Sequence, residues 1–71
     1  MDGFIYIYSR DFIKGPMQVS IFDYSGRLIN QGIIIAENGR LSMDVSDYKK
    51  GLYVIKIVER GQLFIKKVIV E

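Results

Sequence analysis

Hydrophobic residues in this chain recur mainly at every second position, in short runs separated by Gly, Asp and Asn. This period is typical of β-strands that bury one face. The clearest case is the C-terminal segment, where we expect strands over Leu52 to Glu59 and Gln62 to Val70. Arg60-Gly61 joins them, and Gly61 can take the positive φ that a tight hairpin needs. Because an isolated hairpin is barely stable in water, the preceding residues must supply further sheet.

Those preceding residues predict more strands of the same kind. The expected strands, in chain order, are Phe4 to Tyr8, Met17 to Phe22, Arg27 to Gln31, Ile33 to Ile35 and Leu41 to Val45. Within Met17 to Phe22, Met17, Val19 and Ile21 are expected to point inward. Gly32 is expected to interrupt the apolar segment after Gln31. Ser9 to Pro16 breaks the pattern, although Phe12 and Ile13 are expected to pack on the core.

Turn residues stand between these strands. Asp23 can accept hydrogen bonds from backbone amides ahead of it and Gly26 can adopt positive φ, so Asp23 to Gly26, followed by Arg27, predicts a turn. Asn38-Gly39 is the strongest short-range hairpin signal in a sequence. Ser46 to Lys50 is expected to be a polar connection with one helical turn capped by Ser46 or Asp47, before Gly51 opens the last hairpin.

The pattern as a whole gives six or seven short strands and no segment of sustained helical period. Two antiparallel sheets can each bury one apolar face against the other. We therefore predict an all-β fold, a small antiparallel β-sandwich, with residues 1–71 forming a single domain.

Composition narrows the range of functions. The chain of 71 residues has no Cys and no His, so disulfides, thiol metal sites and the commonest general base are missing. No catalytic, cofactor or metal residues are predicted, and an isolated pair such as Asp44 and Asp47 lacks the acidic run of a calcium loop. The net charge of +2, spread along the chain, predicts no nucleic-acid partner. The start at Met1 does not resemble a secretory signal, so export would need one upstream.

Two lysine pairs remain to be explained. Lys49-Lys50 is expected to lie in a solvated loop. Lys66 and Lys67 lie next to each other in a strand, so their side chains point to opposite faces. One of them must then reach solvent over a sheet edge, or the sandwich is open there. The pattern favours an edge strand that is protected by charge.

Several of these segments together resemble the type A C-terminal sorting domain of proteins exported by the type IX secretion system of Bacteroidetes. VSIFDYSGRLINQ resembles the family's strand, Asp-x-x-Gly-Arg turn and strand. LSMDVSDYKKGLYVIKIV resembles its Gly-x-Tyr strand with the strand and loop before it, and FIKKVIVE resembles its Lys-Lys-apolar ending. The resemblance runs from about Val19 to Glu71. The chain departs from the family by lacking an opening Asn-Pro element and by having Tyr48-Lys49 where Leu-Pro is common.

The resemblance implies an immunoglobulin-like sandwich without catalysis, at the end of a larger exported protein. Such a domain carries a passenger from the periplasm across the outer membrane, to the cell surface or the medium. Its implied partners are translocon and sortase components of the type IX system. A recognition signal in the terminal strand would involve residues Lys66, Lys67, Val68, Ile69 and Val70.

A second hypothesis stays open from the residues alone. The chain could be an immunoglobulin-like spacer, adhesion or self-association module of an extracellular protein. Ile33 to Ile35 and the terminal strand offer more apolar surface and strand edge than so small a domain easily covers. We therefore expect the isolated domain to form a homodimer through strand edges.

Overall fold

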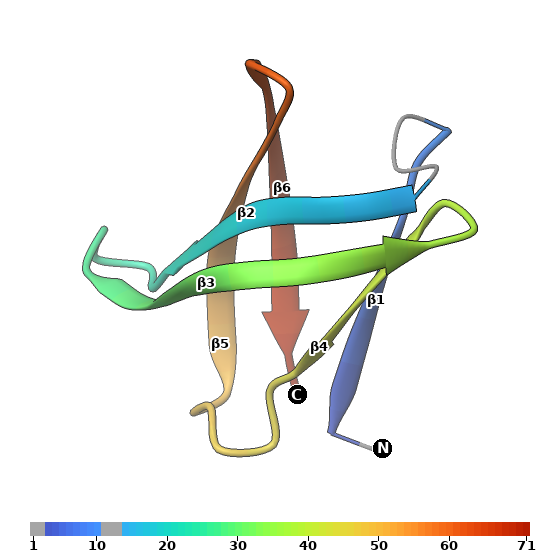
Figure 1. The fold of residues 1–71 in the computed structure, drawn as a ribbon. Helices are drawn as coiled ribbons and strands as arrows, with labels where there is room; N and C mark the ends of the chain where they lie inside the picture. Colours follow the sequence, from blue (N-terminus) through green and yellow to red (C-terminus); the bar gives the residue numbers. More distant parts are fainter. Residues whose placement is uncertain (1–2, 11–13) are drawn as a thin grey trace.

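The computed structural model describes residues 3–10 and 14–71, which form six antiparallel strands (Figure 1). The strands are β1 (Phe4–Tyr8), β2 (Lys14–Phe22), β3 (Leu28–Glu37), β4 (Arg40–Asp44), β5 (Gly51–Glu59) and β6 (Gln62–Val70). No helix occurs in this described part, and consequently none that could span a membrane. The all-β, antiparallel prediction is confirmed.

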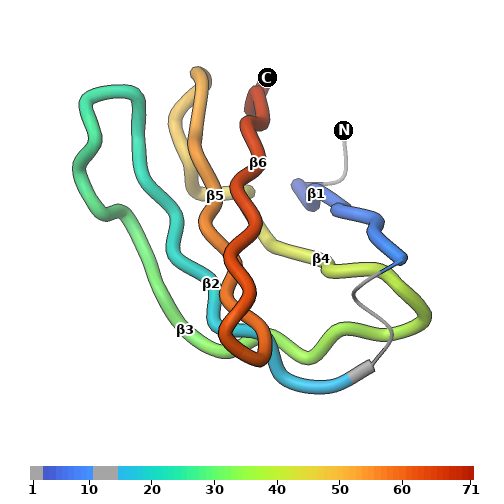
Figure 2. Tube along the Cα trace, turned by 90° about the horizontal axis from the view of Figure 1, so that it is seen from above, coloured from blue at the N-terminus to red at the C-terminus, as the bar shows by residue number. Residues whose placement is uncertain are grey.

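The strands form one curled sheet in the order β1-β4-β3-β2-β5-β6. A single residue pair, Glu37 opposite Arg40, joins β3 to β4, so hydrogen bonding continues round a sharp corner. Viewed from above, the sheet bends until β1 comes back towards β6 (Figure 2). The result is a small β domain consistent with an immunoglobulin-like fold, in which one folded sheet supplies both layers.

The inside of this curl holds an aliphatic core built from alternate strand positions. Its buried residues are Ile7, Met17, Val19, Ile21, Ala36, Leu41, Met43, Val45, Tyr53, Ile55, Ile57 and Val70. The inward positions predicted for β2 are confirmed. No polar or charged residue is buried among the described residues, so apolar packing alone fills the core.

Two strands are longer than their sequences suggested. β2 begins at Lys14, and Pro16 pairs with Ile35 of β3. Proline is tolerated there because β5 pairs with β2 only from Gln18 onward, which leaves one side of β2 as a strand edge at Pro16. β3 also runs without interruption through Gly32. The packing expected for Phe12 and Ile13 lies outside the described residues.

Two connections also differ from expectation. β3 and β4 part after the Asn38-Gly39 turn, so the hairpin predicted there is one residue pair long. The connection after β4 contains a β-turn where a helical turn was expected. The Tyr48 amide donates to the Val45 carbonyl at 3.0 Å. The Asp44 carboxylate accepts from the Ser46 amide at 2.9 Å, so Asp44, the residue before the turn, organises this loop.

Candidate recognition surface

β6 is the last strand in the sheet order and has an open edge. It pairs along its whole length with β5, from Gly51 opposite Val70 to Glu59 opposite Gln62. On its other side, no strand of the described chain pairs with it. The peptide groups that face this side can therefore pair with an added strand.

Three residues of the candidate recognition segment lie on the core-facing side of β6. Val70 is buried, with 4% of its surface exposed, and Val68 is half-buried opposite Tyr53. Lys66 also lies on this side, opposite the buried Ile55, yet its side chain is exposed. An inward-pointing charge on an edge strand discourages unspecific sheet extension, and this protective role of Lys66 stays a prediction.

The opposite side of β6 carries Lys67 and Ile69, both exposed. The five residues predicted to form the signal are therefore divided between two faces of the strand. Sequence reasoning missed a further lysine on this side, Lys56 of β5. Lys56 lies opposite Ile65, and Lys67 lies opposite Val54. The period of two along each strand could have indicated Lys56, but its position beside Lys67 follows only from the hairpin register.

The side of β3-β2-β5-β6 that points away from the core is called the outer face below. Its side chains, strand by strand from β3 to β6, include Leu28, Gln31, Ile33, Ile35 and Glu37; Pro16, Gln18, Ser20 and Phe22; Leu52, Val54, Lys56 and Val58; and Leu63, Ile65, Lys67 and Ile69. Many of these residues are large, apolar and exposed. Ile33 and Ile69, for example, each expose 67% of their surface.

The turn between β2 and β3 is organised by the Asp23 carboxylate. Its Oδ1 atom accepts hydrogen bonds from the Ser25 amide at 2.9 Å, the Ser25 hydroxyl at 2.7 Å and the Arg27 amide at 3.0 Å. The Ser25 side chain, followed by the Arg27 amide, lowers the pKa of Asp23 below its ordinary value. Gly26 has a φ of 89°, and Arg27 Nε lies 3.3 Å from Asp23 Oδ2.

The other expected turn residues lie where the chain reverses or bends. Asn38 and Gly39 have φ values of 52° and 76°, and Gly61 has a φ of 79°. Gly51 has a φ of 148° at the start of β5. Arg60 also adopts a positive φ, 51°, which was not anticipated for a residue that is neither Gly nor Asn.

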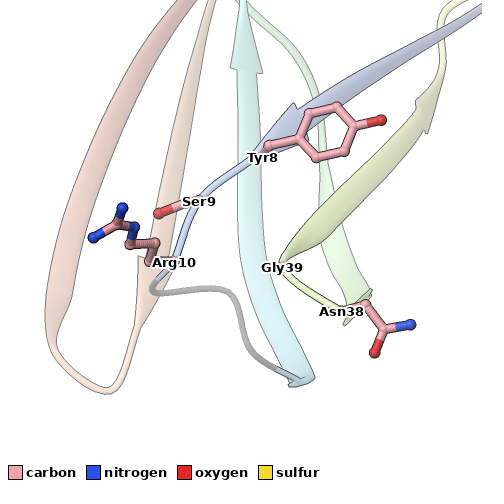
Figure 3. A pocket seen from close by; sticks show the side chains of 5 residues that line it. All are labelled: Tyr8, Ser9, Arg10, Asn38 and Gly39. Carbon is pink, nitrogen blue, oxygen red and sulfur yellow. The ribbon is translucent and has the colours of Figure 1, made fainter.

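One surface hollow of the described chain, of about 580 Å³, lies where the end of β1 meets the turn between β3 and β4. The side chains of Tyr8, Arg10 and Asn38 that line it point in different directions (Figure 3). Among the described residues, no group of three or more acidic residues could hold a metal ion. This geometry is suited to binding a partner through strand and face.

The profile of the family described as secretion system C-terminal sorting domain matches residues 1–71. The chain belongs to this family. The match includes the first strand, where the sequence lacks the Asn-Pro opening. A search of the curated proteins found no significant match.

Sorting domains of this family are C-terminal secretion signals for the type IX secretion system. The domain therefore directs an attached passenger across the outer membrane, and the secretion machinery recognises it. Transit leads to the outer membrane, the cell surface or the medium. The family and the export function expected from the sequence motifs are confirmed.

Proposed function

We propose that residues 1–71 form the single C-terminal sorting domain of a larger exported protein, and that this domain is read in the periplasm through β6. Its partners are the outer-membrane translocon and, at the cell surface, the sortase of the type IX system. The open edge of β6, with exposed lysines beside it, is the observation that carries this proposal.

The edge strand and its flanking charges contribute to recognition in different ways. The strand offers backbone groups for pairing, and exposed lysines steer and orient the partner through charge. Val68 and Val70 fix the strand to the core, while Lys66, Lys67 and Ile69 remain accessible. Such a site requires no catalytic group in the domain.

Export of a reporter tests the proposal. Residues 1–71 are fused behind a periplasmic reporter in a host with a working type IX system, and the reporter is measured outside the cell. We expect Lys66→Ala, Lys67→Ala to impair export with little loss of stability, because exposed charges contribute little to folding. The matched control is Lys49→Ala, Lys50→Ala, which removes the same charge from a loop.

Two outcomes would contradict the proposal. A folded, intact fusion with the natural sequence that stays in the periplasm would favour the spacer or adhesion module. A folded lysine variant exported at the normal rate would show that these lysines only protect the edge.

Self-association through strand edges is a second candidate property of the domain. The open edge of β6 favours it. Sedimentation velocity over a range of concentrations should reveal a homodimer. A monomer at every concentration would exclude self-association.

A further inference from the structure

The outer face carries a pattern that the edge of β6 does not explain. We propose that it docks onto an apolar protein surface that presents carboxylates, on the component of the secretion machinery that reads the domain. This inference rests on the proposed function and names the chemistry of the partner. It extends recognition from the edge of β6 onto the outer face and adds Lys56 of β5 to the recognition residues.

Cross-strand register arranges the outer face in rows. One row runs from Ile33 through Gln18 and Val58 to Leu63. The next row is more polar and contains Gln31, Ser20, Lys56 and Ile65. The third row returns to apolar residues with Leu28, Phe22 and Val54, and it ends at Lys67. Polar groups therefore lie within an apolar surface, where they can fix the orientation of a bound partner.

The charges on the β5 and β6 part of this surface are all positive. Lys56 and Lys67 are diagonal neighbours on β5 and β6, because Lys56 lies opposite Ile65 and Lys67 opposite Val54. Both are exposed, and neither takes part in a salt bridge within the described chain. Carboxylates on the partner would complement these two unpaired lysines, which are surrounded by apolar residues.

A hollow beside Lys56 can accommodate one of these carboxylates. It has a volume of about 390 Å³, and its polar lining comes from Gln18, Ser20, Gln31 and Lys56. The side chains of Gln18, Ser20 and Gln31 form no hydrogen bond with the rest of the described chain. Amide, hydroxyl and ammonium donors can thus converge on an acidic side chain inserted from the partner.

The same features disfavour two other occupants. Packing this face against the same face of a second copy would bring four lysines together, and like charges across an interface are unfavourable. A lipid surface would not need the amide and hydroxyl groups of Gln18, Ser20 and Gln31 that line the hollow beside Lys56. A protrusion from a folded protein fits that hollow better than a headgroup layer does.

The decisive comparison separates Lys67 from its neighbour Lys66, which lies on the core-facing side. In the reporter fusion, Lys56→Glu, Lys67→Glu should lower the rate of export on the order of tenfold or more, because it opposes carboxylates with carboxylates. Lys56→Arg, Lys67→Arg should keep nearly normal export. Lys49→Glu, Lys50→Glu is the matched control, because it reverses the same charge in a loop, and it should leave export nearly normal. Of the single variants, Lys67→Glu should reduce export more than Lys66→Glu, because only Lys67 lies on the outer face. Circular dichroism of each purified domain establishes that it is folded.

The outcomes distinguish this inference from the function on which it rests. If the natural fusion is not exported, the export role of the domain fails. If the natural fusion is exported and the folded Lys56→Glu, Lys67→Glu fusion is exported equally fast, only the docking surface is wrong. Equal losses for Lys66→Glu and Lys67→Glu would also overturn it, because they would confine recognition to the strand edge and exclude the outer face.

Two measurements on the purified domain test the alternative occupants. Co-sedimentation with vesicles of phosphatidylglycerol and phosphatidylcholine should show little binding. Strong binding that disappears in Lys56→Glu, Lys67→Glu would overturn the proposal in favour of a membrane. Sedimentation velocity should give the same oligomeric state for the natural domain and for Ile33→Ser, Ile65→Ser. A dimer that this apolar variant dissociates would assign the face to self-association.

Discussion

Two tight turns reverse the chain with nearly the same backbone and yet lead to different pairing. Asn38-Gly39 has φ values of 52° and 76°, and Arg60-Gly61 has φ values of 51° and 79°. After Arg60-Gly61, β5 and β6 remain paired along their full length. After Asn38-Gly39, β3 and β4 share only the pair Glu37 and Arg40.

The difference shows that turn chemistry sets the reversal of the chain and that burial sets how far pairing continues. Beyond Asn38-Gly39, β4 turns away to pair with β1, where Leu41 lies opposite Ile7. This places Leu41 and Met43 in the core, with 0% and 4% of their surfaces exposed. Continued pairing with β3 would have given up that burial, which is the dominant favourable term in folding.

The largest expected effect tests whether both sides of the corner belong to one cooperative unit. Leu41→Ala in β4 and Ile57→Ala in β5 each truncate a side chain with 0% exposure. Each should lower the free energy of unfolding by about 2–5 kcal/mol, measured by urea denaturation. Ile33→Ala on the outer face is the control and should change it by only about 0.5 kcal/mol. Two separate unfolding transitions would show instead that the sides unfold independently.

A smaller effect is expected from the shared glycine of the two turns. Gly61→Val should destabilise by about 1–2 kcal/mol, because a side chain with Cβ is strained at a φ of 79°. A Cβ atom at Gly61 would meet no other atom within 4 Å, so the loss reports the backbone alone. Gly39→Val, at a φ of 76°, should cost a similar amount. An unchanged melting temperature for either variant would contradict the turn geometry.

Making the two turns identical should stabilise the domain slightly. Arg60 has a positive φ, which Asn tolerates better than Arg does. Arg60→Asn should therefore raise the free energy of unfolding by about 0.5 kcal/mol, since the Arg60 side chain is 88% exposed and its ion pair with Glu59 contributes little. Asn38→Arg makes the reverse exchange at the other turn and should lower the melting temperature. A decrease for Arg60→Asn would mean that the ion pair outweighs the backbone preference.

The smallest effect extends the comparison to a turn held by a side chain. The pKa of Asp23 is below its ordinary value of 3.8, mainly because its carboxylate accepts a hydrogen bond from the Ser25 side chain. The resulting stability is present above about pH 4 and is lost as the pH falls through the folded-state pKa. Melting temperatures measured from pH 6 to pH 2 should therefore fall less steeply for Asp23→Asn. Parallel curves for the two proteins would show that Asp23 does not contribute.

Sequence alone predicted the strands and their faces well, because their cause is local. Alternation in Met17 to Phe22 and in the last hairpin gave the inward residues, since a strand has a period of two. The turn at Asp23 to Gly26 was also predictable, because it is held by hydrogen bonds between residues close together in the sequence. The family motifs then supplied the function.

Features that depend on distant partners could not be read in the same way. Pro16 belongs to a strand because β5 leaves one side of β2 free at that point. Asn38-Gly39 opens only a short hairpin because β1 competes for β4. Lys56 joins Lys67 on one face only through the register of β5 and β6. Each of these features depends on contacts between residues far apart along the chain, or on a strand register that the sequence does not determine by itself.

The central pairing of β2 with β5 also has a consequence for the order of folding. β2 can pair early with β3, its neighbour along the chain, but Val19 must wait for Ile57. Closing that long loop costs chain entropy before any contact offsets it. The domain should therefore fold in milliseconds to seconds, as β proteins with many non-local contacts do. During synthesis, the apolar face of β2 and β3 stays uncovered until β5 has left the ribosome.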